Sequence, residues 1–232
     1  MNLNVLLAAV LIGLILMVVV TSPEMTIILG ACLVAIYWGV SRGIEYFNDQ
    51  TIAQFSALNT QLGVSLEVPE RKLFNLEWTY PALKGAYLGR HLHIAIRNMD
   101  MAGVAVPHTV ITIDTLHSGK TLEISAETLV STLKKIVGKQ DVITGDAEFD
   151  RRFLIKSNDN GFVKKLLDDD IRDILKKEVF LKMGKISLKH SQMFYEEQVV
   201  VNTDNERRRI ENIILVMYMI AKRMEYMRER KI

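Results

Sequence analysis

The sequence predicts an α+β protein in which an N-terminal two-helix transmembrane hairpin precedes one cytosolic domain with a mainly antiparallel sheet and packed helices. Two of the supporting observations come from the N-terminus. Uncharged apolar runs fill Leu3–Val20 and Met25–Val40, and all 29 Lys and Arg residues lie after residue 41. The third observation is that residues 64–125 alternate apolar and polar side chains between glycines, which is typical of antiparallel strands.

The first apolar run is long enough to cross a membrane, and the second is short but usable. As helices they would measure about 27 and 24 Å, against a bilayer core of about 30 Å. Met1–Asn4 carries no basic side chain and Val18–Thr21 offers no small-residue cleavage site, so we expect an uncleaved helix rather than a signal peptide. Between the runs, Ser22 suits an N-cap and Pro23 the first helical position, which predicts a tight turn and an antiparallel second helix.

The distribution of basic residues predicts the orientation. No Lys or Arg precedes Arg42, so the positive-inside rule places both termini and the bulk of the chain in the cytoplasm. The sequence therefore predicts a multi-pass protein of the cell membrane, with the lipid bilayer as a partner. The expected parts are the hairpin at 1–41, a juxtamembrane amphipathic helix at 42–63, and the cytosolic domain at 64–232. The amphipathic helix could pack on the membrane surface, on the domain or on another copy.

Small residues recur every four positions along both apolar runs, a spacing that lets membrane helices approach closely. They are Ala9 and Gly13 on the first run, and Ala31, Ala35, Gly39 and Gly43 on the second helix. Counted from the turn, Gly13 lies at the same depth as Ala31, and Ala9 at the same depth as Ala35, so we expect packing within the hairpin. Gly39 and Gly43 are left for a second subunit. Chance would also produce such a pattern, because Ala and Gly are frequent in membrane helices.

Composition narrows the function classes. Only Glu24 of the 27 acidic residues precedes residue 42, so the rest of the chain, with all 29 basic residues, has a small positive net charge. That balance does not indicate a nucleic-acid-binding surface, and no nucleic-acid partner is predicted. The single cysteine, Cys32, lies within the second apolar run, which leaves no disulfide and no cysteine-based zinc site. No cofactor and no metal is predicted.

Beyond residue 64 the periodicity predicts strands first, then alternating helices and strands. The predicted strands are Leu76–Tyr80, Ala86–Leu88, Leu92–Ile96, Val104–Asp114, Thr121–Ser125, Arg152–Lys156, Lys185–Lys189 and Gln192–Val201. The predicted helices are Ala126–Val137, Gly161–Leu167, Asp168–Lys176 and a long last helix capped by Asp204. His117–Lys120 is predicted to be the hairpin turn after the strand that ends at Asp114.

The densest polar cluster is Gly145–Phe153, in which Asp146, Glu148 and Asp150 stand two residues apart. On an extended segment these carboxylates would face one way, as a divalent-cation site or an acid–base pair requires. The alternative is a structured connector, in which the carboxylates pair with the two following arginines and two phenylalanines anchor the segment in the core. The sequence favours the connector, because the arginines would neutralise a cation site.

Histidines offer a weaker pattern. His91 and His93 share one face of a predicted strand and could supply two metal ligands, with His108 or His117 as a third. No zinc motif accompanies them, so surface histidines are the simpler interpretation. Asp168–Asp170 opens a predicted helix, where acidic side chains cap amides rather than bind metal.

Arginines are the candidate ligand- or lipid-binding residues: Arg90, Arg151, Arg207, Arg208 and Arg209. The last three lie in the first turn of the last helix, where the helix dipole disfavours cations. Either acidic partners within the domain hold them, or they contact anionic headgroups at about 1 kcal/mol per basic residue. The same helix is rich in Met, which suits core packing and also self-association or partner binding.

Two pieces of sequence carry a resemblance: Gly85–Arg90, of the form G-x-x-x-G-R, and Gly145–Phe153, of the form G-D-x-E-F-D-x-x-F. Ser157–Asp159, Leu166–Leu167 and Ile171–Arg172 extend it. Over roughly residues 75–200 the chain resembles a loosely defined group of uncharacterised prokaryotic membrane-anchored proteins with a cytosolic mixed α/β domain. The resemblance implies that organisation and a prokaryotic source, and it implies no activity.

Function follows by elimination. The missing catalytic motifs and the balanced charge predict a membrane-anchored, non-catalytic interaction or scaffold protein, as a homo-oligomer or with a membrane protein partner. The first alternative is a membrane-proximal sensor or binding domain for a lipid headgroup or small ligand. The second is a hydrolase-type enzyme that uses Asp146, Glu148 and Asp150.

Overall fold

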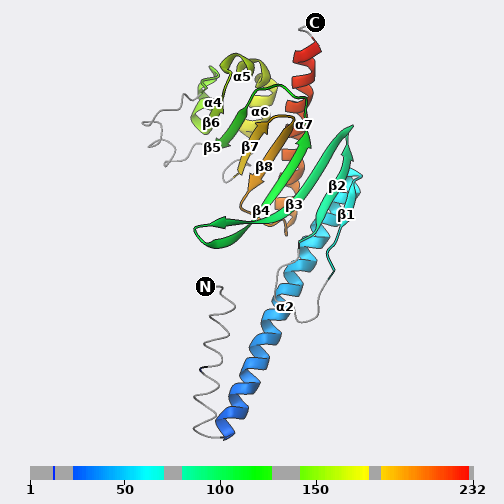
Figure 1. The fold of residues 1–232 in the computed structure, drawn as a ribbon, viewed down its shortest axis with the longest axis vertical. Helices are drawn as coiled ribbons and strands as arrows, with labels where there is room; N and C mark the ends of the chain where they lie inside the picture. The colour runs from blue at the N-terminus through cyan, green and yellow to red at the C-terminus, as the bar shows by residue number, and fades with distance from the viewer. Residues whose placement is uncertain (1–12, 14–22, 71–79, 127–141, 178–183, 230–232) are drawn as a thin grey trace. The chain divides into compact units, whose positions relative to one another are not determined.

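The computed structural model describes residue 13 and residues 23–70, 80–126, 142–177 and 184–229 (Figure 1). Three predicted elements lie wholly or mostly outside these residues: the first apolar run, the strand at Leu76–Tyr80 and the helix at Ala126–Val137. The chain divides into two compact units, Met1–Asn48 with Lys72–Trp78, and Asp49–Arg71 with Thr79–Ile232. The second unit contains the sheet and is called the domain below.

The second apolar run and the juxtamembrane helix form one helix, α2 (Pro23–Leu62). It begins at the proline expected in the first helical position. It ends where Gly63, with a φ of 66°, donates its N–H to the Asn59 carbonyl oxygen at 2.9 Å. Among the described residues it is the one helix long and apolar enough to cross a membrane. The predicted hairpin needs a second such helix, which would fall in residues outside the description.

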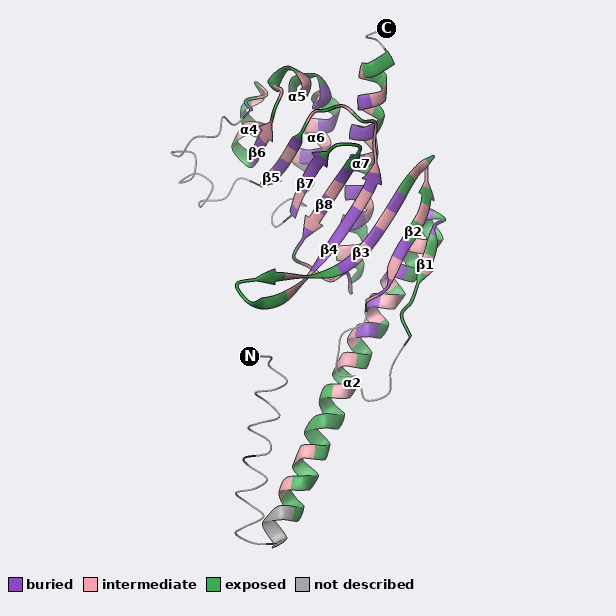
Figure 2. Cartoon of the chain, in the orientation of Figure 1, coloured by how far each residue is buried: buried purple, intermediate pink, exposed green. Residues whose placement is uncertain are grey.

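The exposure of side chains changes along α2 (Figure 2). Ile27, Ile28 and Ile36, which lie on different sides of the helix, are 74%, 57% and 62% exposed, whereas Phe55 and Leu58 are fully buried. Apolar side chains exposed on several sides are typical of a helix that faces lipid. The buried residues keep the three-to-four spacing of an amphipathic helix and belong to the core of the domain. Of the partners open to the amphipathic segment, its last turns therefore pack on the domain.

One eight-stranded sheet is the framework of the domain, and all its neighbouring strands run antiparallel. The strands are β1 (Ser65–Glu67), β2 (Ala82–Tyr87), β3 (Arg90–Met101), β4 (Val104–Asp114), β5 (Leu122–Ala126), β6 (Phe153–Ser157), β7 (Gly184–Lys189) and β8 (Gln192–Glu197). Their order across the sheet is β1-β2-β3-β4-β8-β7-β5-β6. The predicted α+β class with an antiparallel sheet is confirmed.

The prediction that His117–Lys120 is a β-hairpin turn after the strand ending at Asp114 is wrong. β4 pairs with β3 and β8, and β5 pairs with β6 and β7, so His117–Lys120 connects strands that are not neighbours. The reason is that alternation identifies a strand and its buried face without identifying its partner. Here β8, some eighty residues later in the chain, aligns Tyr195 with Ile111 and places both apolar side chains on one face.

Four described helices follow the first strands: α4 (Ala147–Arg152), α5 (Asn160–Leu166), α6 (Asp169–Lys177) and α7 (Asp204–Glu229). The cap of α7 lies one residue before the predicted Asp204. The Thr203 hydroxyl accepts the Glu206 N–H at 3.3 Å, and the Glu206 carboxylate accepts the Thr203 N–H at 3.0 Å. This reciprocal pair is a capping box, which fixes where the helix begins.

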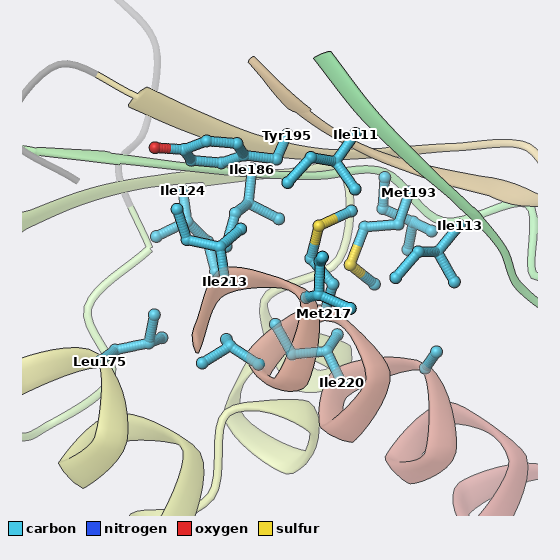
Figure 3. Packing of buried hydrophobic residues seen from close by; sticks show 14 of the residues in the cluster. Ile111, Ile113, Ile124, Leu175, Ile186, Met193, Tyr195, Ile213, Met217 and Ile220 are labelled. Carbon is cyan, nitrogen blue, oxygen red and sulfur yellow. The ribbon is translucent and has the colours of Figure 1, made fainter. Parts of the chain in front are cut away.

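The core lies between one face of the sheet and the helices (Figure 3). Alternate residues of β4, β8, β7 and β5 point towards α7, whose stripe of Ile and Met side chains meets them. Tyr195, Met217 and Ile220 are each 0% exposed. Of the two interpretations of the Met-rich last helix, core packing is the one that the structure shows for its buried stripe.

Candidate functional site

Helix α4 uses the predicted acidic cluster as a helix cap. Oδ1 of Asp146 accepts the N–H groups of Glu148 and Phe149, both at 3.1 Å. One turn later, Oδ1 of Asp150 accepts the Thr144 hydroxyl at 2.7 Å and the Thr144 N–H at 3.0 Å. Two of the three carboxylates are therefore bonded to the backbone that starts the helix.

The extended acidic segment, the alternative that the sequence did not favour, is absent from this part of the described chain, because Ala147–Arg152 is helical. Residues two apart on a helix point to different sides, so the three carboxylates do not share one face. Glu148 instead pairs with Arg152 at 3.3 Å, one turn along α4. Phe149 and Phe153 are buried with their ring centroids 4.7 Å apart, as the connector interpretation expects.

Asp146 also links α4 to α6. Its Oδ2 lies 2.8 Å from Nζ of Lys176 and 3.6 Å from Nε of Arg172. The hydrogen bond from Lys176 and the amide of Phe149 lower the pKa of Asp146. The hydrogen bonds of Lys176 to Asp146 and Asp173 raise the pKa of Lys176. A carboxylate held ionised between two cations and two amides stabilises the connection between helices rather than accepting a proton in a reaction.

The histidines do not gather into a metal site. His91 and His93 lie on one face of β3, as predicted from their spacing. Burial lowers the pKa of His93 most, and the neighbouring charges of Arg97 and Lys84 lower it further. Among the described residues, no three or more His, Cys, Asp or Glu side chains are grouped so that they could hold a metal ion.

Arg90 is bonded within the domain. Its guanidinium lies 2.5 Å from the Glu225 carboxylate of α7, donates to the Asp114 carbonyl oxygen at 3.1 Å and lies 6.0 Å from the centroid of the Tyr218 ring. The Tyr87 ring meets the Tyr218 ring edge-on at 6.3 Å. The G-x-x-x-G-R piece therefore places an arginine that connects the turn between β2 and β3 to α7.

The arginine cluster of α7 divides into bonded and exposed members. Arg207 contacts Glu211 at 2.5 Å and donates to the Gln54 side-chain oxygen of α2 at 3.1 Å. Arg209 forms an ion pair with Glu197, whose side chain is 2% exposed. For these two arginines the acidic partners lie within the domain. Arg208, like Arg151 of α4, is exposed. Contact of any of these arginines with a ligand or lipid stays a prediction.

The small residues of α2 lie on the exposed part of that helix. Ala31, Ala35, Gly39 and Gly43 are exposed, and a Cβ built on either glycine would meet no atom within 4 Å. Ala9 lies outside the described residues, so its pairing with Ala35 stays a prediction, as does the pairing of Gly13 with Ala31.

A pocket that the sequence did not indicate lies within the domain, where the loop between β4 and β5 meets α5 and the last turns of α7. Its volume is about 180 Å³. Its lining residues are Leu116, His117, Ser118, Lys120, Phe162, Met224, Met227 and Arg228. They come from three segments far apart in sequence, which periodicity cannot bring together. None of the five candidate arginines lines this pocket.

Hydrogen bonds hold the loop that lines this pocket. The Asn158 side chain accepts the Thr121 N–H at 2.9 Å and donates to the Gly119 carbonyl oxygen at 3.1 Å. The Ser157 hydroxyl donates to the Thr121 carbonyl oxygen at 2.6 Å, and Lys120 pairs with Asp159 at 2.7 Å. Residues 157–159, which extended the resemblance noted in the sequence, thus fix the pocket wall.

The chain was compared with family models, with curated proteins and with solved structures. No family model and no curated protein matches the sequence. A solved structure, the mycobacterial trehalose monomycolate transport factor A, TtfA, is similar at 10% sequence identity with a TM-score of 0.46. The match covers 75% of this chain and 94% of the other. At this level of similarity nothing about activity, ligand or partner transfers from that protein to this chain.

Proposed function

We propose that this chain is a membrane-anchored, non-catalytic interaction or scaffold protein that works as a homo-oligomer or within a larger membrane assembly. The observation that carries the proposal is the exposed apolar part of α2. Ile27, Ile28, Val34, Ile36 and Trp38 are all more than half exposed on one helix. Such a surface needs lipid or protein around it, because contiguous apolar area of this kind is rare on soluble monomers.

Leu3–Val20 forms the other helix of the proposed anchor, antiparallel to α2 across a turn at residues 21–24. This hairpin returns the chain to its starting side of the membrane. Because the loop has no basic residue and all 29 Lys and Arg residues lie after residue 41, both termini lie in the cytoplasm. The anchor thus keeps the domain at the cytoplasmic membrane surface.

The charges of the domain support a non-catalytic role. An acid–base pair in a hydrolase must reach its substrate and exchange protons near neutral pH. Asp146 is instead bonded to two backbone amides and lies within 4.0 Å of two cations, and its pKa is lowered. Asp150 is bonded to the backbone before α4, and Glu148 pairs with Arg152 at the surface.

Gly39 and Gly43 are the proposed contact between copies. They lie one turn apart on the same side of α2, both are exposed, and a Cβ on either has no neighbour within 4 Å. Helices with small residues at this spacing approach closely enough for backbone contact in a membrane. Gly30, nine residues before Gly39, lies about 180° away around the helix and serves as the control position.

Native mass spectrometry of the protein, extracted gently from its own membrane, tests the proposal. We expect a discrete oligomer or a stoichiometric protein partner. Gly39→Leu with Gly43→Leu should dissociate the oligomer, whereas Gly30→Leu should leave it intact. A monomer without a protein partner in the unaltered chain would contradict the proposed function. Equal effects of the two sets of substitutions would contradict the assigned face.

A further inference from the structure

The pocket at the end of α7 combines an apolar lining with unpaired positive charge. Leu116, Phe162, Met224 and Met227 supply apolar surface, and Arg228 adds a guanidinium group. Within the part of the chain that the structure describes, no carboxylate pairs with Arg228. Lys120 pairs with Asp159 at 2.7 Å, so the charge of this carboxylate is already balanced. The pocket surroundings therefore favour an anion.

We propose that this pocket binds a small anionic amphiphile, whose apolar part fills the cavity and whose carboxylate or phosphate group pairs with Arg228. The inference does not depend on the scaffold role proposed above. It rests on the volume of the cavity, the chemistry of its lining and the absence of an acidic partner for Arg228 among the described residues.

The volume sets the size of the apolar part. The cavity measures about 180 Å³, and an engineered apolar protein cavity of about 150 Å³ is known to hold benzene. One aromatic ring or a short alkyl chain therefore fills it. Pockets for whole drug-sized ligands are larger, at about 300–1,000 Å³. The polar group of the ligand thus stays at the opening, near the charged side chains.

The lining chemistry selects the polar group. A guanidinium presents a planar set of N–H donors that matches the two oxygens of a carboxylate or phosphate. The Ser118 hydroxyl oxygen accepts the Lys120 N–H at 3.2 Å, so its own O–H is available as a donor. The two methionines adapt to differently shaped apolar groups because their side chains are unbranched and polarisable.

The test uses the full-length chain in nanodiscs with ¹³C-labelled methionine methyl groups and hexyl phosphate as the probe. We expect the Met224 and Met227 methyl resonances to shift, while those of Met193 and Met217, which are buried in the sheet core at 0% exposure, stay in place. Hexanol lacks the anion and inorganic phosphate lacks the chain, so both should bind at least tenfold more weakly. Equal binding of hexanol and hexyl phosphate would overturn the proposal, as would equal shifts at all four methionines.

A chain-length series separates the pocket from the bilayer. Butyl, pentyl and hexyl phosphate should each improve the dissociation constant by about fourfold per buried methylene group, and the gain should stop once the cavity is full. A gain that continued through dodecyl phosphate would place the chain in lipid and overturn the proposal. Hexanoate compared with hexyl phosphate identifies the preferred anion, and binding of either at Met224 and Met227 supports the inference.

Substitutions at two basic residues of α7 complete the test. Arg228→Gln should weaken hexyl phosphate binding about tenfold and leave hexanol binding unchanged, and Arg228→Lys should restore part of the loss. Lys222→Gln removes an equal charge from an exposed position of the same helix that does not line the pocket, and it should bind as the unaltered chain does. Equal losses of hexyl phosphate affinity in Arg228→Gln and Lys222→Gln would show that only the net charge of the protein matters, and would overturn the assignment of Arg228 as the anion-binding residue.

Discussion

The ring of Tyr195 on β8 covers Gly184 on the adjacent strand β7. A Cβ added at Gly184 would lie 2.5 Å from Cζ and 2.6 Å from Cε2 of that ring, closer than real Cβ atoms come to any neighbour. Tyr195 is 0% exposed, and its hydroxyl donates to the Glu197 carboxylate at 3.0 Å. The glycine therefore makes room for the Tyr195 ring, whose hydroxyl oxygen is drawn in red in Figure 3.

Gly184→Ala should lower the free energy of unfolding by about 1–3 kcal/mol, the usual cost of overpacking a filled core. The ring cannot move away without breaking its bond to Glu197. Pulse proteolysis of the full-length chain in detergent across a urea series measures the change. Tyr195→Leu in the same chain should reduce the cost of the alanine.

Gly161→Ala is the matched control for that substitution. A Cβ at Gly161 meets only the Asp159 Oδ1 atom, at 3.4 Å, which is ordinary contact. Because Gly161 lies in helix α5 and alanine has the higher helix propensity, this variant should be neutral or more stable by up to about 1 kcal/mol. Equal losses in both variants would show that the Tyr195 ring is not the cause.

Arg209→Met should be strongly destabilising, by about 3–5 kcal/mol, because it leaves the buried Glu197 charge without its cationic partner. Glu197 is 2% exposed, so water cannot replace the guanidinium. The neighbouring Arg208 is exposed, and Arg208→Met should change the stability by no more than about 0.5 kcal/mol. The same urea series measures both variants.

The loss in Arg209→Met should also depend on pH. Burial raises the pKa of Glu197, and the guanidinium of Arg209 opposes that rise in the unaltered protein. A carboxyl group with a raised pKa in the folded state contributes fully below its unfolded pKa, and the contribution is lost as the pH rises through the raised value. The deficit of the variant should therefore shrink as the pH falls towards 4.5. A deficit that stays constant with pH would contradict a buried charge as its cause.

The Asp146 carboxylate should make the domain sensitive to acid. Its pKa is lowered by the Lys176 hydrogen bond and the Phe149 amide, so its contribution is present above the ordinary Asp value and is lost as the pH falls through the lowered one. Asp146→Asn should be less stable than the unaltered chain at pH 7, and the two stabilities should converge as the pH falls below the ordinary Asp value of about 4.

Thermal unfolding followed by circular dichroism at several pH values tests this expectation. Glu148→Gln is the control, because Glu148 is a half-exposed neighbour that pairs with Arg152 on the surface. It should shift the midpoint less than Asp146→Asn at pH 7. Parallel pH profiles for the unaltered chain and Asp146→Asn would contradict a structural role for the ionised carboxylate.

Local signals in the sequence predicted most of the secondary structure. Pro23 begins α2 as predicted from cap chemistry, α2 ends at Leu62 beside the predicted limit at residue 63, and the alternation at residues 109–114 lies within β4. These predictions worked because each depends on residues within one or two turns. At residues 146–150 the spacing of the carboxylates left an extended segment open as an alternative. The side chain of Asp146 instead bonds the next amides and starts a helix.

Contacts between residues far apart in the chain could not be predicted from the sequence. Nothing in β4 identifies β8 as its neighbour, and the pocket joins Leu116, Phe162 and Met227 from three separate segments. The partners of Arg90 and Arg209 are likewise distant, since Glu225 and Glu197 lie on other elements. An arginine in the first turn of a helix indicates an acidic partner, yet the dipole argument does not say which one.

The topology of the anchor can be tested at the turn between its two helices. In a Cys32→Ser background, a cysteine at Ser22 should react with a membrane-impermeant maleimide in intact cells, because the hairpin places this turn outside. Cysteines at Asn2 and at Ser191, in the exposed turn between β7 and β8, should react only after the membrane is permeabilised. Labelling of Asn2 in intact cells together with protection of Ser191 would mean that α2 crosses alone, with the N-terminus outside. That outcome would contradict the hairpin. The domain would still lie in the cytoplasm, because Arg42 and the basic residues after it determine the side of the membrane on which the domain stays.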